Sequence, residues 1–181
     1  MSLTTESNST FEEVKIIKNN LFKDNRGYFN KVFFDDIEKK LSFKVDEIFY
    51  SINNKGVIRG IHFQKNPHIL GKIINCIHGE ILDFFIDLRK DSETYGKFSS
   101  ELLSEENNIS LLVPEGFGHG FSVISETATV LYLQSGNYSQ DHESGINPLS
   151  LDFDWHVDNP TISERDLSHN NFDIDNNDFK L

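Results

Sequence analysis

Cysteine, methionine and tryptophan each occur only once in the 181 residues of the sequence. The single cysteine, Cys76, excludes an intrachain disulfide, and its place in an apolar, strand-like segment predicts a buried thiol in a reducing cytoplasm. Long apolar runs are also missing, so the sequence predicts no membrane-spanning helix. Residues 1–10 lack the basic start and apolar centre of a signal peptide, and we expect a flexible, polar N-terminus there.

Basic residues are scarce: 17 Lys and Arg stand against 29 Asp and Glu, which gives a formal net charge of −12. Such a surface repels nucleic acid and anionic membranes, so we expect neither as a partner. A ligand that carries phosphate needs a local cluster of basic side chains instead. Phenylalanine is abundant, with 16 residues, and apolar side chains suffice for the core of one domain.

The order of the predicted elements indicates an all-β protein. Short segments rich in β-branched and aromatic residues alternate with turns, and the only helix predicted in the first two-thirds covers residues 35–41. The predicted strands cover residues 11–21, 28–34, 45–52, 57–64, 72–78, 80–89, 98–103, 110–113, 121–125 and 128–135. This pattern predicts a jelly-roll β-sandwich or barrel over residues 11–168, which can enclose one small ligand. We expect the Asn- and Asp-rich residues 169–181 to form a mobile or surface tail.

Alternation assigns the side chains of two predicted strands to opposite faces of a sheet. In the segment 80–89, one face carries Leu82, Phe84, Ile86 and Leu88, and the other carries Ile81, Asp83, Phe85 and Asp87. The second face mixes two acids with large apolar groups, which suits a small polar cavity better than bulk solvent. In the segment 128–135, one face carries Ala128, Val130, Tyr132 and Gln134.

The segment 114–119, PEGFGH, resembles the second conserved motif of the cupin superfamily of jelly-roll barrels. Metal-binding cupins carry two His separated by one residue in their first motif, but here that position contains His62, Phe63 and Gln64. A transition-metal site needs three or four ligands in one geometry. Because His62 and His119 fall short of that set, we expect no metal centre.

A larger set of motifs runs from Phe22 to Asp166. Its members are RGIHFQ at 59–64, LGK at 70–72, GEILD at 79–83, IDLR at 86–89, SETYG at 92–96, LSEEN at 103–107, VPEGFGHGF at 113–121, Tyr132, Tyr138 and ISERD at 162–166. In order and spacing this set resembles the dTDP-4-dehydrorhamnose 3,5-epimerase family. The resemblance implies a cofactor-free isomerase that epimerises nucleotide-linked 4-keto-6-deoxy sugars for bacterial surface polysaccharides. It also implies a homodimer whose N-terminal strands pack onto the partner's sheet.

Four residues match the catalytic positions of that family. A ketone at C4 acidifies the hydrogens on C3 and C5, so inversion needs a base on one face, an acid on the other and a stabilised enolate oxygen. His62 matches the base, since a neutral imidazole at cytoplasmic pH accepts a proton, and Asp166 matches its carboxylate partner. Lys72 matches the stabiliser of the enolate oxygen, and Tyr132 matches the acid.

Other residues are expected to contact the substrate. The resemblance assigns Arg26 and Arg59 to phosphate and sugar, and Tyr138 to the neighbourhood of the nucleotide or sugar. The remaining expected contacts are Gln64, His119, Glu47, Phe49 and Lys31. Strict alternation places Arg59 and His62 on opposite faces of one strand. Either Gly60 forms a bulge, or Arg59 serves another surface such as one across a dimer.

Three of these residues depart from the family's pattern. Lys31 stands where the family has Glu, and Glu47 and Phe49 stand where it has Gln and Asn. These changes alter hydrogen bonding and volume in the predicted cavity, so we expect a variant that acts on another 4-keto sugar, such as a GDP-linked 6-deoxy-4-keto-heptose. Three alternatives stay open: the dTDP-4-dehydrorhamnose 3,5-epimerase itself, a 3,4-ketoisomerase of the same barrel, and a non-catalytic nucleotide-sugar binding protein.

Overall fold

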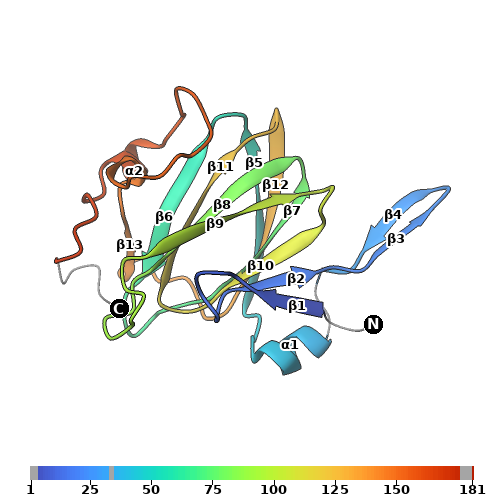
Figure 1. Ribbon diagram of the computed structural model, residues 1–181, viewed down its shortest axis with the longest axis horizontal. Coiled ribbons are helices and arrows are strands. Elements are labelled where there is room, and N and C mark those ends of the chain that lie inside the picture. Colours follow the sequence, from blue (N-terminus) through green and yellow to red (C-terminus); the bar gives the residue numbers. More distant parts are fainter. Residues whose placement is uncertain (1–3, 33–34, 176–180) are drawn as a thin grey trace.

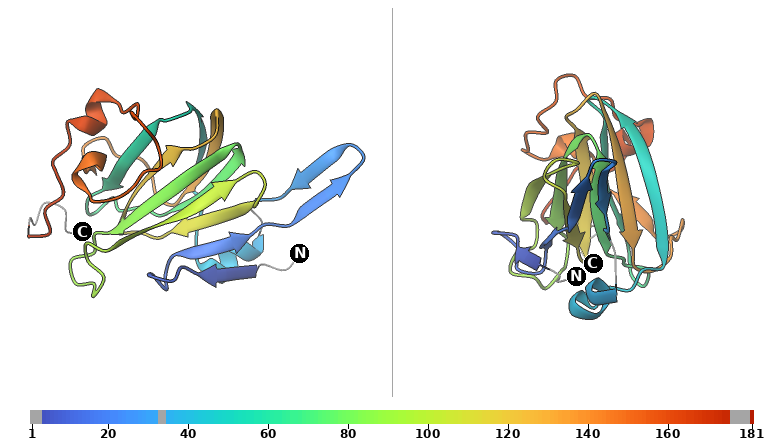
Figure 2. Two further views of the ribbon diagram at one scale, coloured as in Figure 1. Left: turned by 45° about the horizontal axis from the view of Figure 1, so that its top comes forward. Right: turned by 90° about the vertical axis from the view of Figure 1, so that its right-hand side faces the viewer.

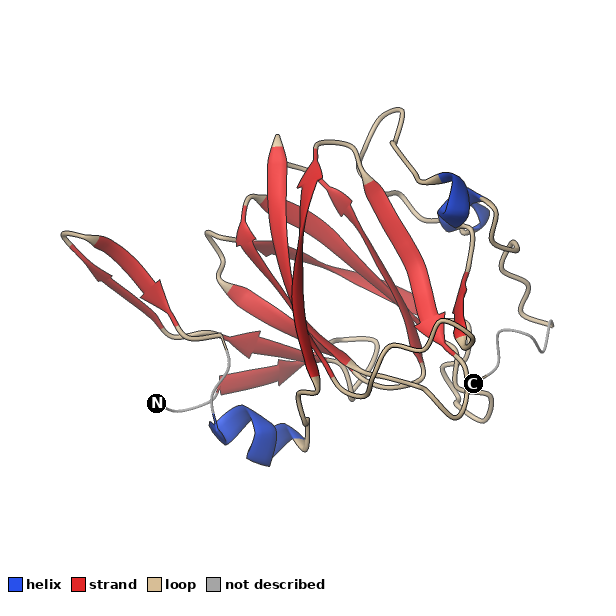
Figure 3. Ribbon diagram, turned by 180° about the vertical axis from the view of Figure 1, so that it is seen from behind, coloured by secondary structure: helices blue, strands red, loops and turns tan. Residues whose placement is uncertain are grey.

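The computed structural model describes residues 4–32, 35–175 and 181, and it consists mainly of antiparallel β-strands (Figures 1 and 3). The strands are β1 (Thr4–Ser7), β2 (Lys15–Lys18), β3 (Leu21–Asp24), β4 (Gly27–Asn30), β5 (Glu47–Asn54), β6 (Ile58–Gln64), β7 (Lys72–His78), β8 (Glu80–Asp87), β9 (Phe98–Ser104), β10 (Ile109–Val113), β11 (Phe117–Val123), β12 (Thr127–Gln134) and β13 (Glu143–Gly145). The helices are α1 (Asp35–Leu41), the 3-10 helix η1 (Pro148–Ser150) and α2 (Glu164–Leu167). The helix predicted at residues 35–41 is confirmed.

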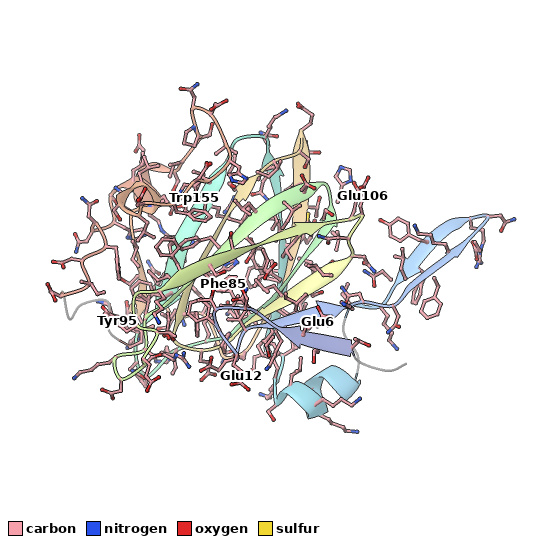
Figure 4. The ribbon with its side chains drawn as sticks, in the orientation of Figure 1. Glu6, Glu12, Phe85, Tyr95, Glu106 and Trp155 are labelled. Atoms are coloured by element: carbon pink, nitrogen blue, oxygen red, sulfur yellow. The ribbon has the colours of Figure 1, made fainter. Side chains whose placement is uncertain are left out.

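Two sheets form the body of the molecule. A six-stranded sheet has the order β1-β2-β10-β7-β12-β5, and a five-stranded sheet has the order β13-β6-β11-β8-β9. The main core lies between them and contains Phe85, which Figure 4 shows in the interior, together with Phe121, Ile74 and Val130. Burial of these side chains stabilises the fold by roughly 25 cal/mol for each Å² of apolar surface removed from water. The fold is therefore the predicted β-sandwich.

The predicted alternation in β8 and β12 is confirmed by the packing. Phe84 and Ile86 point to the outer side of the five-stranded sheet, where they pack in a second cluster with Trp155. Ile81 and Phe85 point to the inner core. In β12, Ala128, Val130 and Tyr132 belong to the inner core, whereas Leu133 packs on the other face of its sheet.

The described residues near both ends of the chain contact the sheets. Residues 4–7 form β1, which pairs antiparallel with β2. At the other end, the Asn147 N–H donates to the Asn170 carbonyl at 3.0 Å. Phe172 and Leu181 pack against the cluster around Trp155. The few apolar residues among the Asn and Asp thus attach the described part of the tail to the sheet.

Strand β11 begins at Phe117, whereas the sequence predicts a Gly-rich loop to residue 121. Its glycines serve packing: a Cβ on Gly118 would lie 2.9 Å from the side chains of Ile61 and Ile86, and one on Gly120 would lie 2.9 Å from the Arg59 carbonyl. Only a residue without a side chain lets β11 approach β6 so closely.

The β3–β4 hairpin extends away from the two sheets (Figure 2). The aromatic side chains of Phe22, Tyr28 and Phe29 on it are 50–61% exposed. The predicted strand over residues 28–34 ends at Asn30, and residues 33–34 lie outside the described part of the chain.

Candidate active site

A cavity of about 330 Å³ opens between the two sheets. Its lining residues are Phe49, Tyr50, Ser51, Arg59, His62, Lys72, His119, Phe121, Tyr132, Gln134, Tyr138, Glu143 and Arg165. One wall comes from the five-stranded sheet, where His62 of β6 is the Cα partner of His119 of β11. The other comes from the six-stranded sheet, where Gln134 of β12 is the partner of Lys72 of β7 and Tyr132 lies two residues before it.

Arg59 and His62 line the same cavity, although they are three residues apart on β6. The pairing of β6 with β11 shifts register beside Gly60, which has φ of +121°. A Cβ at Gly60 would lie 2.6 Å from the Gly120 Cα. Of the two explanations that the sequence leaves open, the irregularity at Gly60 is therefore the one found.

His62 forms a dyad with Asp166. The His62 Nε2 lies 2.8 Å from the Asp166 Oδ1, and the Gly60 N–H donates to the Asp166 Oδ2 at 3.1 Å. Asp166 is buried at the start of α2, where Ser163 caps the helix by accepting from the Asp166 N–H. Burial opposes ionisation of Asp166, but hydrogen bonds from His62 and Gly60 outweigh it and lower its pKa to about 2. Because Nε2 faces a carboxylate, the proton stays on Nε2 and Nδ1 is the basic nitrogen.

Lys72 is a partly buried cation in this cavity. Burial lowers its pKa to about 8, although Asp83 and Glu143 oppose the shift by their charge. Asp83 is fully buried, and its Oδ2 lies 2.9 Å from the His119 Nε2. Burial raises the pKa of Asp83, and His119 and Lys72 act in the other direction. With a pKa of about 8, the Lys72 ammonium group can lose its proton only slightly above neutral pH.

Tyr132 is buried on the wall that faces His62. Burial raises the pKa of its phenol above the usual value, and interaction with the Ser51 hydroxyl opposes that shift in part. Its ring stacks on Phe49 with centroids 4.9 Å apart and an interplanar angle of 20°. A phenol held in this way keeps its proton and can donate it.

Comparison with known proteins identifies the family of the chain. The family model of dTDP-4-dehydrorhamnose 3,5-epimerase matches residues 8–173. The dTDP-4-dehydrorhamnose 3,5-epimerase of Shigella flexneri is 38% identical over 167 residues, which cover 88% of this chain and 91% of the relative. That of Methanothermobacter thermautotrophicus is 38% identical over 158 residues and covers 83% and 85%. This chain belongs to the dTDP-4-dehydrorhamnose 3,5-epimerase family.

Solved structures of epimerases share the fold. A dTDP-6-deoxy-D-glucose-3,5-epimerase from Legionella pneumophila, in complex with dTDP-4-keto-L-rhamnose, has a TM-score of 0.88 at 30% identity and covers 93% of this chain and 92% of its own. The dTDP-4-dehydrorhamnose 3,5-epimerase from Sulfolobus tokodaii has a TM-score of 0.87 at 36% identity, with coverage of 94% and 95%. The chain is thus an isomerase of this epimerase family with the predicted jelly-roll fold. No helix in the described residues has the length and apolar character needed to cross a membrane.

Most residues that the resemblance assigns to the site line this cavity. They are His62, Lys72, Tyr132, Arg59, His119, Phe49 and Tyr138, and Asp166 lies behind His62. Arg59, Lys72 and Arg165 give the cavity the local basic cluster that a phosphate-bearing ligand needs in an acidic protein. Neither of the two acids predicted on one face of β8 lines the cavity, but Asp83 contacts His119, which does. Asp87 instead binds Arg89, Ser92 and Thr94.

Gln64 and Glu47, two predicted substrate contacts, lie outside the cavity lining and hold the loop that carries Tyr138. The Gln64 Oε1 accepts from the Ser139 N–H at 2.6 Å, and its Nε2 donates to the His68 carbonyl at 2.7 Å. The Glu47 Oε1 accepts from the Tyr138 N–H at 3.0 Å. Hydrogen bonds to backbone occupy polar atoms that were expected to face substrate, so these residues position the site from behind.

Arg26 and Lys31 also lie outside the cavity of this chain. Arg26 is in the β3–β4 turn, where it pairs with Asp24 and its side chain is 86% exposed. Lys31 is exposed directly after β4. Within a single chain, the projecting hairpin separates both residues from His62.

Glu143 and Arg165 line the cavity but were missed from the sequence. The Glu143 Oε2 accepts from the Tyr138 hydroxyl at 2.7 Å, and its Oε1 accepts from the Arg165 Nη2 at 2.5 Å. The position of Arg165, directly before Asp166, was the one available signal. Nothing near Glu143 in the sequence marks it, because only the pairing of β13 with β6 brings it to the site.

Proposed function

We propose that the chain epimerises a nucleotide-diphosphate-linked 4-keto-6-deoxyhexose at both C3 and C5, without a cofactor. The observation that carries this proposal is the placement of His62 and Tyr132 on opposite walls of one cavity, with Lys72 beside them. Inversion of a carbon requires removal of a proton from one face and its return from the other, which this arrangement permits. The names of the relatives favour a dTDP-linked hexose over the GDP-linked heptose expected from the sequence.

The steps follow from the properties of each group. The His62 Nδ1 accepts the proton from the carbon next to the ketone, the electron pair moves to the ketone oxygen, and Asp166 stabilises the resulting imidazolium. The Lys72 ammonium neutralises the enolate oxygen. Tyr132 then donates its proton to the opposite face of the carbon while the carbonyl re-forms. Proton exchange with solvent resets both groups, so the chemistry balances without an oxidant or reductant.

Three residues that line the cavity, Arg59, Arg165 and Tyr138, position the substrate in this proposal. Arg59 and Arg165 provide charge for the diphosphate. Tyr138, held through its hydroxyl by Glu143, offers a ring for the nucleotide or sugar. Acting in the cytoplasm suits both a nucleotide-sugar substrate and the reduced, buried Cys76.

A homodimer would bring Arg26 and Lys31 to the partner's cavity. Support comes from the hairpin, which carries exposed aromatic side chains away from its own body, and from β5, an edge strand on which Ile48, Tyr50 and Ile52 are 65–67% exposed. Exposed apolar surface of this kind marks interaction sites. Light scattering coupled to size-exclusion chromatography should give twice the chain mass. A monomer with full activity would exclude this role for the hairpin.

Incubation with candidate sugars in deuterated water tests the activity. A dTDP-linked and a GDP-linked 4-keto-6-deoxy sugar should be compared by proton NMR and by product separation. Deuterium at C3 and C5 of the dTDP sugar with inversion at both carbons supports the proposal. Incorporation at one carbon indicates a single-site epimerase, a product with the ketone moved to C3 indicates a ketoisomerase, and binding without exchange indicates a binding protein. Preference for a GDP-heptose would restore the substrate expected from the sequence.

A further inference from the structure

A second imidazole lies directly behind the dyad. His169, in the segment after α2, has its ring centroid 6.2 Å from that of His62. One potential ligand atom from each of His62, Asp166 and His169 lies within 4.8 Å of the others. Among residues 4–32, 35–175 and 181, these form the one cluster of three His, Cys, Asp or Glu side chains close enough to share a metal ion. Two imidazoles and a carboxylate make up the ligand set of many open zinc sites.

Packing against bare backbone places His169 there. Gly145 of β13 is the Cα partner of His62 on β6, and a Cβ on Gly145 would lie 2.4 Å from the His169 Nε2. The missing side chain leaves the space that the His169 ring occupies. The backbone hydrogen bond between Asn147 and Asn170 then fixes the next residue of the tail. The position of His169 is therefore built by two separate contacts.

The His169 Nε2 is buried and has no hydrogen-bond partner in the described structure. A buried polar atom without a partner is unfavourable, and its presence calls for an explanation such as an ion that belongs there. A neutral imidazole with an unused lone pair is the form that binds a metal.

We propose that His62, Asp166 and His169 form a binding site for a divalent transition metal, Zn²⁺ above all, and that metal binding switches the enzyme off. Tetrahedral ligands at about 2.1 Å from zinc lie about 3.4 Å apart. The 2.8 Å contact between His62 and Asp166 must open slightly, and the widest pair, within 4.8 Å, must close by no more than about 1.4 Å. Small side-chain movements are enough.

Metal binding at this place blocks the base. A metal on the His62 Nε2 forces the remaining imidazole proton onto Nδ1, which then has no lone pair to accept a proton from a sugar. A pocket of about 460 Å³ lined by His62, Asp166, Thr161 and Ser163 gives a route to the metal site. Arg59 and Arg165 also line this pocket, and the ion pair of Arg165 with Glu143 weakens their combined repulsion of a metal cation.

Cobalt titration of the full, tag-free, metal-stripped chain tests the binding site. Co²⁺ should give the visible absorption of a low-symmetry site with one ion per chain, Zn²⁺ should displace it, and Mg²⁺ should not, because it prefers oxygen ligands. His169→Phe keeps a flat ring against Gly145 and removes both nitrogens. Since loss of a group that only supports a ligand weakens metal binding about 10- to 100-fold, loss of this ligand should weaken it at least about 100-fold.

His142→Phe is the matched control, because His142 and His68 are another close imidazole pair, with ring centroids 4.2 Å apart. It should leave Co²⁺ binding unchanged. Thermal melting of His169→Phe should match that of the natural protein, since the lost Nε2 has no partner. Equal Co²⁺ affinity in His169→Phe and the natural protein, a loss only in His142→Phe, or no stoichiometric binding would each overturn the proposal.

Inhibition rests on the proposed function and is measured separately. Zn²⁺ should abolish deuterium exchange in the natural protein, a chelator should restore it, and His169→Phe should keep exchanging at zinc concentrations that silence the natural enzyme. If the metal binds as described but the metal-free protein exchanges no candidate sugar, the metal site stands and the epimerase proposal fails. Equal inhibition of both proteins would refute the switch.

Discussion

Asp166→Asn is the sharpest test of the dyad, because it removes one charge and keeps the shape. The Asn oxygen can still accept from the Gly60 N–H, and the cap of α2 at Ser163 uses backbone that does not change. The new NH₂ group, however, faces the His62 Nε2 and can only donate to it. The imidazole proton must then move to Nδ1, the nitrogen that we propose as the base.

The structure gives the size of the charge effect. The contacts of Asp166 with His62, Gly60 and Ser163 lower its pKa to about 2, which corresponds to roughly 2 kcal/mol in favour of the carboxylate. Gly60 and Ser163 share in this stabilisation, so loss of the charge alone, as in Asp166→Ala, should slow exchange by less than about 10²-fold. Asp166→Asn adds the wrong tautomer and should approach the loss of about 10⁴ seen for the same change in a catalytic triad.

The assay is the initial rate of deuterium incorporation at C3 and C5 at neutral pH, followed by proton NMR. Asp154→Asn is the matched control, since Asp154 also faces a histidine, His156, but at 3.5 Å and on the exposed surface. The control should exchange at the natural rate. An exchange rate of Asp166→Asn within about threefold of the natural enzyme, or a slower rate in Asp166→Ala than in Asp166→Asn, would refute this role of Asp166.

Three further predictions concern neighbouring groups. Lys72→Met should lower the exchange rate about 10²- to 10³-fold, as loss of an oxyanion donor does. In the natural enzyme, kcat/KM should fall above pH 8, where Lys72 loses its proton. An unchanged kcat/KM up to pH 10 would count against the role of Lys72. Because the folded-state pKa of Asp166 is depressed, its contribution to stability is complete above about pH 4 and is lost as the pH falls toward 2; urea unfolding should show the natural protein and Asp166→Asn converging in that window, and a constant gap would contradict this. Phe49→Ala removes the ring stacked on Tyr132, a contact worth about 0.5–1.5 kcal/mol, and should slow inversion more than exchange; equal slowing in the NMR and product assays would argue against Tyr132 as the acid.

Local patterns in the sequence predicted those parts of the fold that depend on residues near one another in the chain. Alternation in β8 and β12 predicted which side chains enter the core, because a strand has a period of two wherever one face is buried. It failed between Arg59 and His62, since the shift at Gly60 depends on pairing with β11, a strand that lies about 60 residues away in the sequence. No pattern within β6 carries that information.

Site residues brought in by distant segments were the ones missed. The family motifs named His62, Lys72, Tyr132 and Asp166, which the structure brings to one cavity or directly behind it. Glu143 and His169 depend on the pairing of β13 with β6 and on the return of the tail across it. Gln64 and Glu47 were assigned to substrate for a similar reason: their residue types suit either a sugar or a loop backbone, and only the path of residues 136–139 decides between them.

The two-sheet architecture explains why this fold suits chemistry on both faces of a ring. Packed sheets lie about 10 Å apart, so side chains from facing strands leave room for one flat sugar where core packing is interrupted. His62 and Tyr132, the proposed base and acid, stand on different sheets and line the same cavity. Strand-mounted groups are also held more rigidly than groups on loops. Phe49 has two roles, since it lines the cavity and its ring also stacks on the ring of Tyr132. We therefore expect a change at Phe49 to alter both the space for substrate and the delivery of the proton that Tyr132 is proposed to donate.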